Sequence, residues 1–171
     1  MNISKNHHKV FLIAVVILFI GMYVIIFRNN KFNSNITNNK NFLREYNSTF
    51  MGIYIKFPEY YKIKDINSII TLTKGQNNIS ITLNNSNYEN LQEYLAFYDE
   101  TRQISKIIEL IPNKSKYDSV GRIFKIGTTE QKSYFFYKNY QVIILSTSSP
   151  DLYDDLDQIA ASFEYLGDTS E

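Results

Sequence analysis

The segment Tyr134-Phe-Phe-Tyr-Lys-Asn-Tyr-Gln-Val-Ile-Ile-Leu-Ser146 carries the strongest structural signal in this chain of 171 residues. Most of its residues are aromatic or β-branched, which are the types that strands favour. Lys138 and Asn139 break the run, and asparagine tolerates the positive φ of a tight hairpin turn. The pattern predicts two strands, Lys132–Tyr137 and Gln141–Thr147, that pair at the centre of a sheet, because so apolar a pair would promote aggregation at an edge.

Shorter strand patterns stand on the N-terminal side of this pair. Residues 50–57 alternate between apolar positions, at Ile53, Ile55 and Phe57, and more polar ones, and Pro58 ends the run because proline lacks a ladder donor. Residues 74–78 have the composition of a hairpin turn. The further strands that the pattern predicts are Ile69–Thr73, Ile79–Leu83, Ile104–Ile111 and Val120–Thr128.

A first amphipathic helix is predicted between these strands. Ser86 and Glu89 have the spacing of a capping box, and the helix is expected to end near Arg102 or Gln103. Its apolar stripe, with the spacing of one helix face, consists of Leu91, Tyr94, Leu95 and Tyr98.

A second helix is predicted after the central strand pair. Ser149 is expected as its N-cap, with Pro150 in the first turn. Its expected buried stripe is Leu152, Leu156, Ile159, Ala160 and Phe163, and the acidic residues Asp151, Asp154, Asp155 and Asp157 are expected to face water. The whole pattern predicts the α+β class, as an α/β/α sandwich with a central antiparallel sheet in residues 42–171.

The N-terminal part of the chain has a different character. Residues 10–27 carry no charge and are long enough, at about 1.5 Å per residue, to cross a bilayer as a helix. We interpret them as a transmembrane signal anchor between a short basic tail, residues 1–9, and an Asn-rich flexible linker, residues 28–41. The lipid-facing anchor residues that we name are Val10, Phe11, Leu12, Ile13, Val16, Ile17, Ile20, Val24 and Phe27.

This anchor predicts a single-pass protein of the plasma membrane whose partner is the lipid bilayer. A short basic tail before an apolar run is typical of export signals, so we expect the C-terminal domain on the extracytoplasmic side. A cleaved signal peptide, giving a secreted form of the same domain, is the alternative. The apolar run is longer than the about 7–15 residues that such peptides have, and the bulky residues Tyr23 to Phe27, and then Arg28, stand where a small-x-small cleavage site is expected.

The order of predicted elements resembles the PsbP-like domain, named for an extrinsic subunit of photosystem II and shared by bacterial secreted and membrane-anchored proteins. The resemblance rests on Ile53-Tyr-Ile-Lys-Phe-Pro58, Asn78-Ile-Ser-Ile-Thr82, Leu91-Gln-Glu-Tyr-Leu95, the strand pair from Tyr134 to Ser146, and Leu156-Asp-Gln-Ile-Ala-Ala-Ser-Phe163. It implies an α/β/α sandwich around an antiparallel sheet. Members of this family are mostly binding or assembly subunits, so it implies no enzymatic activity.

The composition excludes several kinds of chemistry. The chain has no cysteine, and its two histidines, His7 and His8, precede the predicted domain. Thiol and histidine catalysis and sites built on those ligands are therefore excluded there. From residue 29 onward, 15 basic residues face 17 acidic ones, which argues against nucleic acid as a partner. We expect no cofactor, no metal and no catalytic residue.

Tyrosines near predicted turns and strand ends are the candidates for an interaction surface. They are Tyr60, Tyr61, Tyr117, Tyr137 and Tyr140. The sequence thus predicts a non-catalytic binding or assembly module with a protein partner in the cell envelope. The alternative function is a cell-envelope hydrolase that uses a carboxylate pair, for which Glu89, Glu93 and Glu100 on the first helix are the candidates.

Overall fold

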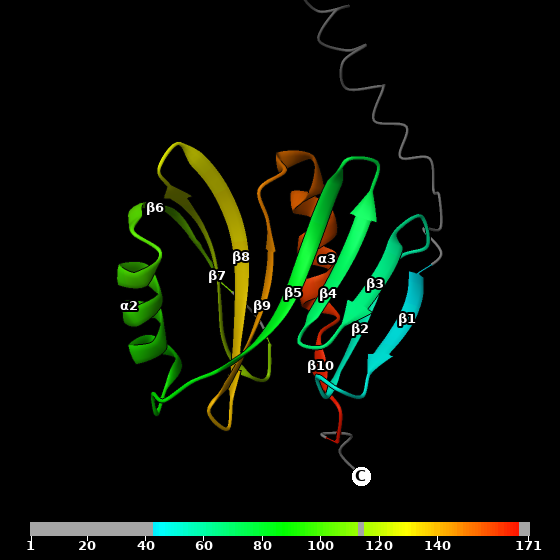
Figure 1. Cartoon of the computed structure of the whole chain (residues 1–171), viewed down its shortest axis with the longest axis horizontal. Helices are drawn as coiled ribbons and strands as arrows, with labels where there is room; N and C mark the ends of the chain where they lie inside the picture. The colour runs from blue at the N-terminus through cyan, green and yellow to red at the C-terminus, as the bar shows by residue number, and fades with distance from the viewer. Residues whose placement is uncertain (1–42, 113–114, 168–171) are drawn as a thin grey trace, which may run out of the picture. The chain divides into compact units, whose positions relative to one another are not determined.

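The computed structural model describes residues 43–112 and 115–167 (Figure 1). The predicted anchor, residues 10–27, and the linker, residues 28–41, lie outside the described residues. Within the described ranges, no helix is both long enough and apolar enough to cross a membrane.

The main layer of the described part is a seven-stranded antiparallel sheet with the order β3-β4-β5-β9-β8-β7-β6. Its strands are β3 (Lys62–Ile66), β4 (Ile69–Lys74), β5 (Asn77–Asn85), β6 (Ile104–Ile111), β7 (Asp118–Ile126), β8 (Thr129–Lys138) and β9 (Gln141–Thr147). The prediction that the apolar hairpin lies centrally is confirmed, because β8 and β9 have two strands on one side and three on the other. β6 and β3 are the two edge strands.

The turn between β8 and β9 lies one residue further along than predicted. β8 includes Lys138, and the two turn residues are Asn139 and Tyr140, with φ of 50° and 60°. Two consecutive positive φ values are the signature of a type I′ turn, whose twist matches that of the flanking strands. A bulky residue such as tyrosine is sterically disfavoured at positive φ. The backbone carbonyl of Tyr140 accepts a hydrogen bond from Ser86 N at 2.7 Å.

A second, three-stranded sheet has the order β1-β2-β10. Its strands are β1 (Leu43–Ser48), β2 (Ile53–Pro58) and β10 (Glu164–Tyr165). Sequence analysis found β2 but missed β1, β3 and β10. β1 and β3 are largely exposed, so they lack an apolar alternation, and β10 is only two residues long.

One face of the seven-stranded sheet packs against the small sheet and the C-terminal helix. This helix begins as a 3-10 turn, η1 (Pro150–Leu152), and continues as α3 (Tyr153–Ala161). Ser149 precedes η1 without a side-chain capping bond. The predicted buried stripe is confirmed: Leu152, Leu156, Ile159, Ala160 and Phe163 all lie in one core cluster with Ile53, Ile55, Phe57, Phe136 and Leu145.

The opposite face is covered in part by α2 (Leu91–Thr101). Leu91, Tyr94 and Tyr98 are buried against Phe135, and Leu95 is partly buried, as predicted. The predicted capping box is wrong: the N-cap is Asn90, whose side chain accepts from Glu93 N at 2.9 Å. Helices therefore pack on both faces of an antiparallel sheet, and the α+β prediction is confirmed.

Candidate functional site

A trough runs across the part of the sheet that α2 leaves uncovered. It consists of three adjoining hollows of about 400, 340 and 340 Å³. The first shares Leu83, Asn84, Tyr98 and Arg102 with the second, and shares Ser68 and Ile69 with the third. The shared residues make the three hollows one continuous surface from α2 to the β3–β4 turn. We call this surface the trough.

The floor of the trough is a row of hydroxyl groups set by strand register. Thr71 pairs with Ser80, and Ser80 pairs with Ser146, across β4, β5 and β9. Directly paired residues of antiparallel strands point to the same face. The row continues at one end to Lys64 and at the other to Ser133 and Arg122. Small polar side chains here leave space that larger apolar ones would fill.

The row passes beneath α2 at its far end. There the guanidinium of Arg122, which is 2% exposed, makes two bonds to the carboxylate of Asp99 on α2, one of them at 3.0 Å. The same guanidinium lies 4.8 Å from the ring centroid of Phe135. The helix α2 covers the row only as far as this buried pair. The next residues of the row, Ser146, Ser80 and Thr71, are half-buried.

The charge of the trough is opposite in sign to that of the domain. Arg102 and Lys64 line it, and no aspartate or glutamate is among the residues lining its three hollows. Neither cation forms an ion pair in the described part of the chain. Apolar side chains stand at its borders: Ile66, Ile69 and Phe97 are 51%, 47% and 45% exposed. Such a surface can bind a segment that carries both carboxylates and apolar side chains.

A cavity of about 480 Å³ lies on the other face of the sheet, beside α3. Two carboxylates, from Asp157 and Glu164, are among its lining residues. Asp157 is already engaged, because it forms an ion pair with the nearly buried Lys132 at 2.5 Å and accepts from the Tyr134 hydroxyl at 2.8 Å. Burial, and then that hydrogen bond, raise the pKa of Tyr134.

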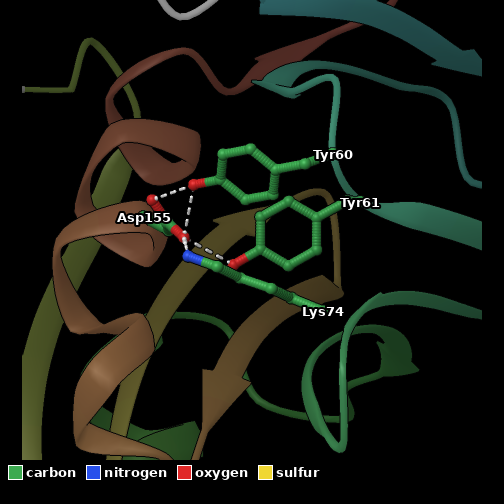
Figure 2. A network of polar contacts seen from close by, with 4 residues as sticks. All are labelled: Tyr60, Tyr61, Lys74 and Asp155. Atoms are coloured by element: carbon green, nitrogen blue, oxygen red, sulfur yellow. Dashed lines mark hydrogen bonds and ion pairs between the residues drawn. The ribbon is translucent and has the colours of Figure 1, made fainter.

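Asp155 is the centre of a further polar network (Figure 2). It lies in the first turn of α3, and its side chain is 15% exposed. The hydroxyls of Tyr60 and Tyr61 each donate to it at 2.8 Å, and Lys74 Nζ donates at 3.2 Å. The ammonium of Lys74 also lies 4.4 Å from the ring centroid of Tyr60. The network joins the β2–β3 connection and β4 to α3.

The electrostatics of this network are those of a structural contact. Burial, followed by the hydrogen bond to Asp155, raises the pKa of both Tyr60 and Tyr61. For Lys74, burial lowers the pKa, but the hydrogen bond and charge of Asp155 outweigh it, so the pKa is raised. Tyr60 and Tyr61 therefore stay neutral, and Lys74 stays charged, at neutral pH. The prediction that these aspartates face water is wrong for Asp155, whose side chain is 15% exposed, whereas the side chain of Asp157 is 44% exposed although it accepts a hydrogen bond from Tyr134.

The five predicted interaction tyrosines do not form one surface. Tyr60 and Tyr140 are 46% and 55% exposed, whereas Tyr61 is buried in the core. Tyr117 packs edge-on against Tyr165, with ring centroids 4.9 Å apart, and Tyr137 donates to the Tyr88 carbonyl at 2.7 Å. Tyr60 contacts Lys74 beside the β4–β5 turn, while Tyr140 stands at the opposite end of β9. The trough includes none of the five.

The predicted carboxylate candidates do not gather into a site. Glu89, Glu93 and Glu100 are exposed on or before α2, and none lines a hollow described above. In residues 43–112 and 115–167, no group of three or more histidine or acidic residues is placed to hold a metal ion.

Sequence reasoning missed the residues that form the trough. The sequence predicts Arg102 only as a possible helix end, and it places Thr71, Ser80 and Ser146 only within predicted strands. Their alternation with apolar residues was visible, but it did not show which strands are neighbours.

No protein-family model matches this sequence, and no curated protein matches it. Among solved structures, the chain is similar to the solution structure of the cyanobacterial PsbP protein CyanoP from Synechocystis sp. PCC 6803, with 12% identity and a TM-score of 0.49, over 72% of this chain and 92% of that one. A crystal structure from Bacteroides thetaiotaomicron VPI-5482 is similar with 10% identity and a TM-score of 0.50, over 75% of this chain and half of that one. Both similarities are at low sequence identity and concern the fold alone.

Proposed function

We propose that this protein is a non-catalytic binding module whose trough holds a segment of a protein partner. The observation that carries the proposal is the charge of the trough: Arg102 and Lys64 line it without any lining carboxylate, in a domain with an excess of acidic residues. The partner segment is acidic, which balances those cations, and carries apolar side chains that cover Ile66, Ile69 and Phe97.

The proposal includes the membrane anchor and the location. Residues 10–27 hold the chain in the plasma membrane as a single pass, and residues 28–41 act as a flexible spacer. The domain then meets its partner on the extracytoplasmic side. The uncharged length of residues 10–27 and the basic residues before them support this arrangement.

Photo-crosslinking in intact cells tests the trough. A photoreactive phenylalanine analogue is placed at Thr71 or Ser80, on the floor, and at Phe50, which is 67% exposed elsewhere on the domain. We expect one adduct from the two floor positions and none of that mass from Phe50. Mass spectrometry of the adduct should identify a segment with acidic and apolar residues.

A charge reversal provides the matched control. Arg102→Glu should abolish the adduct, because it places a carboxylate against the partner's carboxylates, while Lys116→Glu, the same change in sign outside the trough, should leave it intact. An adduct that survives Arg102→Glu, or a crosslinked segment without acidic residues, would show that the trough is not the binding site.

Hydrolysis by a carboxylate pair is the second candidate function, and the cavity beside α3 is the observation that favours it. Asp157 and Glu164 both line that cavity. A hydrolase acting there should lose its activity on cell-envelope glycans in Asp157→Asn and in Glu164→Gln. Wild-type protein that releases no product from those glycans would count against this function and leave the binding proposal standing.

A further inference from the structure

The β6 edge, residues Ile104–Ile111, is one of the two outer strands of the seven-stranded sheet. Within the described residues β6 pairs only with β7. It also carries exposed apolar side chains: Ile107, Ile108 and Leu110 are 43%, 41% and 65% exposed. An edge of this kind is a template for pairing with another strand.

The sequence of this edge is self-complementary. It reads Ile104-Ser-Lys-Ile-Ile-Glu-Leu-Ile111. If two copies pair antiparallel about a point between Ile107 and Ile108, then Lys106 of each copy stands opposite Glu109 of the other, and Ile107 stands opposite Ile108. A two-fold axis repeats every contact, so both ends of the pairing gain an opposite-charge pair.

The irregularities of β6 put these charges on the same face. In a regular strand, residues three apart, such as Lys106 and Glu109, point to opposite faces. A register shift between Ile107 and Glu109 changes this, so that Lys106 pairs with Lys125 and Glu109 with Ile123, two residues apart on β7. Both side chains therefore lie on the α3 face. Glu109 also contributes to the raised pKa of Tyr134, which belongs to that face.

We propose that two copies of this chain associate through the β6 edge as an antiparallel two-fold dimer with one continuous sheet. Bulges and charges on edge strands commonly prevent pairing with other proteins. Here the charges complement a second copy, and they disfavour a strand that carries like charges at the facing positions. A two-fold axis perpendicular to the sheet preserves its faces, so both troughs lie on the same side and a partner with two acidic segments binds with avidity.

Disulfide trapping of the full chain in detergent micelles tests the register. The natural sequence has no cysteine, so only the introduced thiols can form a disulfide. Chains with Lys106→Cys and with Glu109→Cys are mixed and oxidised. We expect a disulfide dimer in the mixture and little in either variant alone, because identical positions would be on the order of 10 Å apart, beyond the Cα separation that a disulfide spans.

Charge exchange tests the complementarity by sedimentation of the same full-length protein. Lys106→Glu and Glu109→Lys should each weaken the dimer by about tenfold or more, since each turns two attractive pairs into repulsive ones. The double variant Lys106→Glu/Glu109→Lys should restore it to within about threefold, because it only exchanges the charges. Lys62→Glu, on the opposite edge strand β3, should have no effect.

Three results would overturn the proposal. The first is a monomeric wild-type chain at about 100 μM, a concentration well above the dissociation constant of a specific dimer. The second is an equal yield of disulfide dimer in the mixture and in the two single cysteine variants. The third is a double charge variant whose dimer is as weak as the dimers of the single charge variants. All of these changes are at exposed side chains, so circular dichroism should show the same fold throughout.

Discussion

Gly121 on β7 and Tyr134 on β8 are direct cross-strand partners, and the tyrosine ring occupies the space where a side chain at position 121 would lie. A Cβ atom built on Gly121 would come within 2.8 Å of Tyr134 Cδ1. The ring cannot move away freely, because its hydroxyl donates to Asp157. Gly121 therefore has a steric role and not a conformational one.

Gly121→Ala should destabilise the domain by about 1–3 kcal/mol through overpacking. Urea denaturation of a fragment spanning residues 42–171 measures the free energy of unfolding. In the double variant Gly121→Ala/Tyr134→Ala, the two losses of stability should be non-additive, because alanine at position 134 removes the clash. Fully additive effects would mean that the two residues do not compete for space.

Asp155→Asn should cost about 2–3 kcal/mol of stability, because Tyr61 and Lys74 lose charge-assisted hydrogen bonds to a carboxylate that is 15% exposed. Asp154→Asn is the matched control. Asp154 is exposed in the same first turn of α3, so it has the same position relative to the helix dipole without the network. Equal losses in the two variants would assign the effect to the dipole.

Stability should fall at high pH as tyrosines ionise. Burial, and then the hydrogen bond to Asp65, raise the pKa of Tyr46 to about 12. The neutral phenol is favoured by the fold, so this contribution is complete below about pH 10, the ordinary pKa of tyrosine. It is lost as the pH rises through 12. Phenolate absorbance should show a late-titrating fraction that Tyr46→Phe reduces, and an unchanged titration would contradict the hydrogen bond.

Tyr140→Gly should stabilise the domain by about 0.5–1 kcal/mol, because Tyr140 has a φ of 60° that glycine adopts without strain. Tyr140→Ala keeps the Cβ and should give no such gain. Thermal denaturation of the 42–171 fragment compares the two variants. A loss of stability in the glycine variant would show that the exposed ring contributes packing that outweighs the strain.

The anchor predicts that the full-length chain stays in the membrane after alkaline carbonate extraction, whereas the 42–171 fragment is released. N-terminal sequencing of protein from cells should begin before residue 10. A start after residue 27 would identify a cleaved signal peptide instead. A cysteine introduced at Ser148, which is exposed and lies outside β6, should react with a membrane-impermeant maleimide in intact cells if the domain is extracytoplasmic.

Elements with a local signal could be predicted from the amino-acid sequence. The central pairing of β8 and β9 and the buried stripe of α3 follow from apolar periodicity over a few consecutive residues, and that periodicity directly reflects which side faces the core. The PsbP-like resemblance used the order of these same elements.

Features that depend on residues far apart in the chain could not be predicted in this way, because they follow from the folded arrangement. β1 and β3 are strands because partners elsewhere in the chain pair with them, although their own side chains are mostly exposed. Asp155 is a network centre because Tyr61 reaches it from the β2–β3 connection and Lys74 reaches it from β4. The trough exists because strand order brings Thr71, Ser80 and Ser146 into one row, and local propensity contains no information about that order.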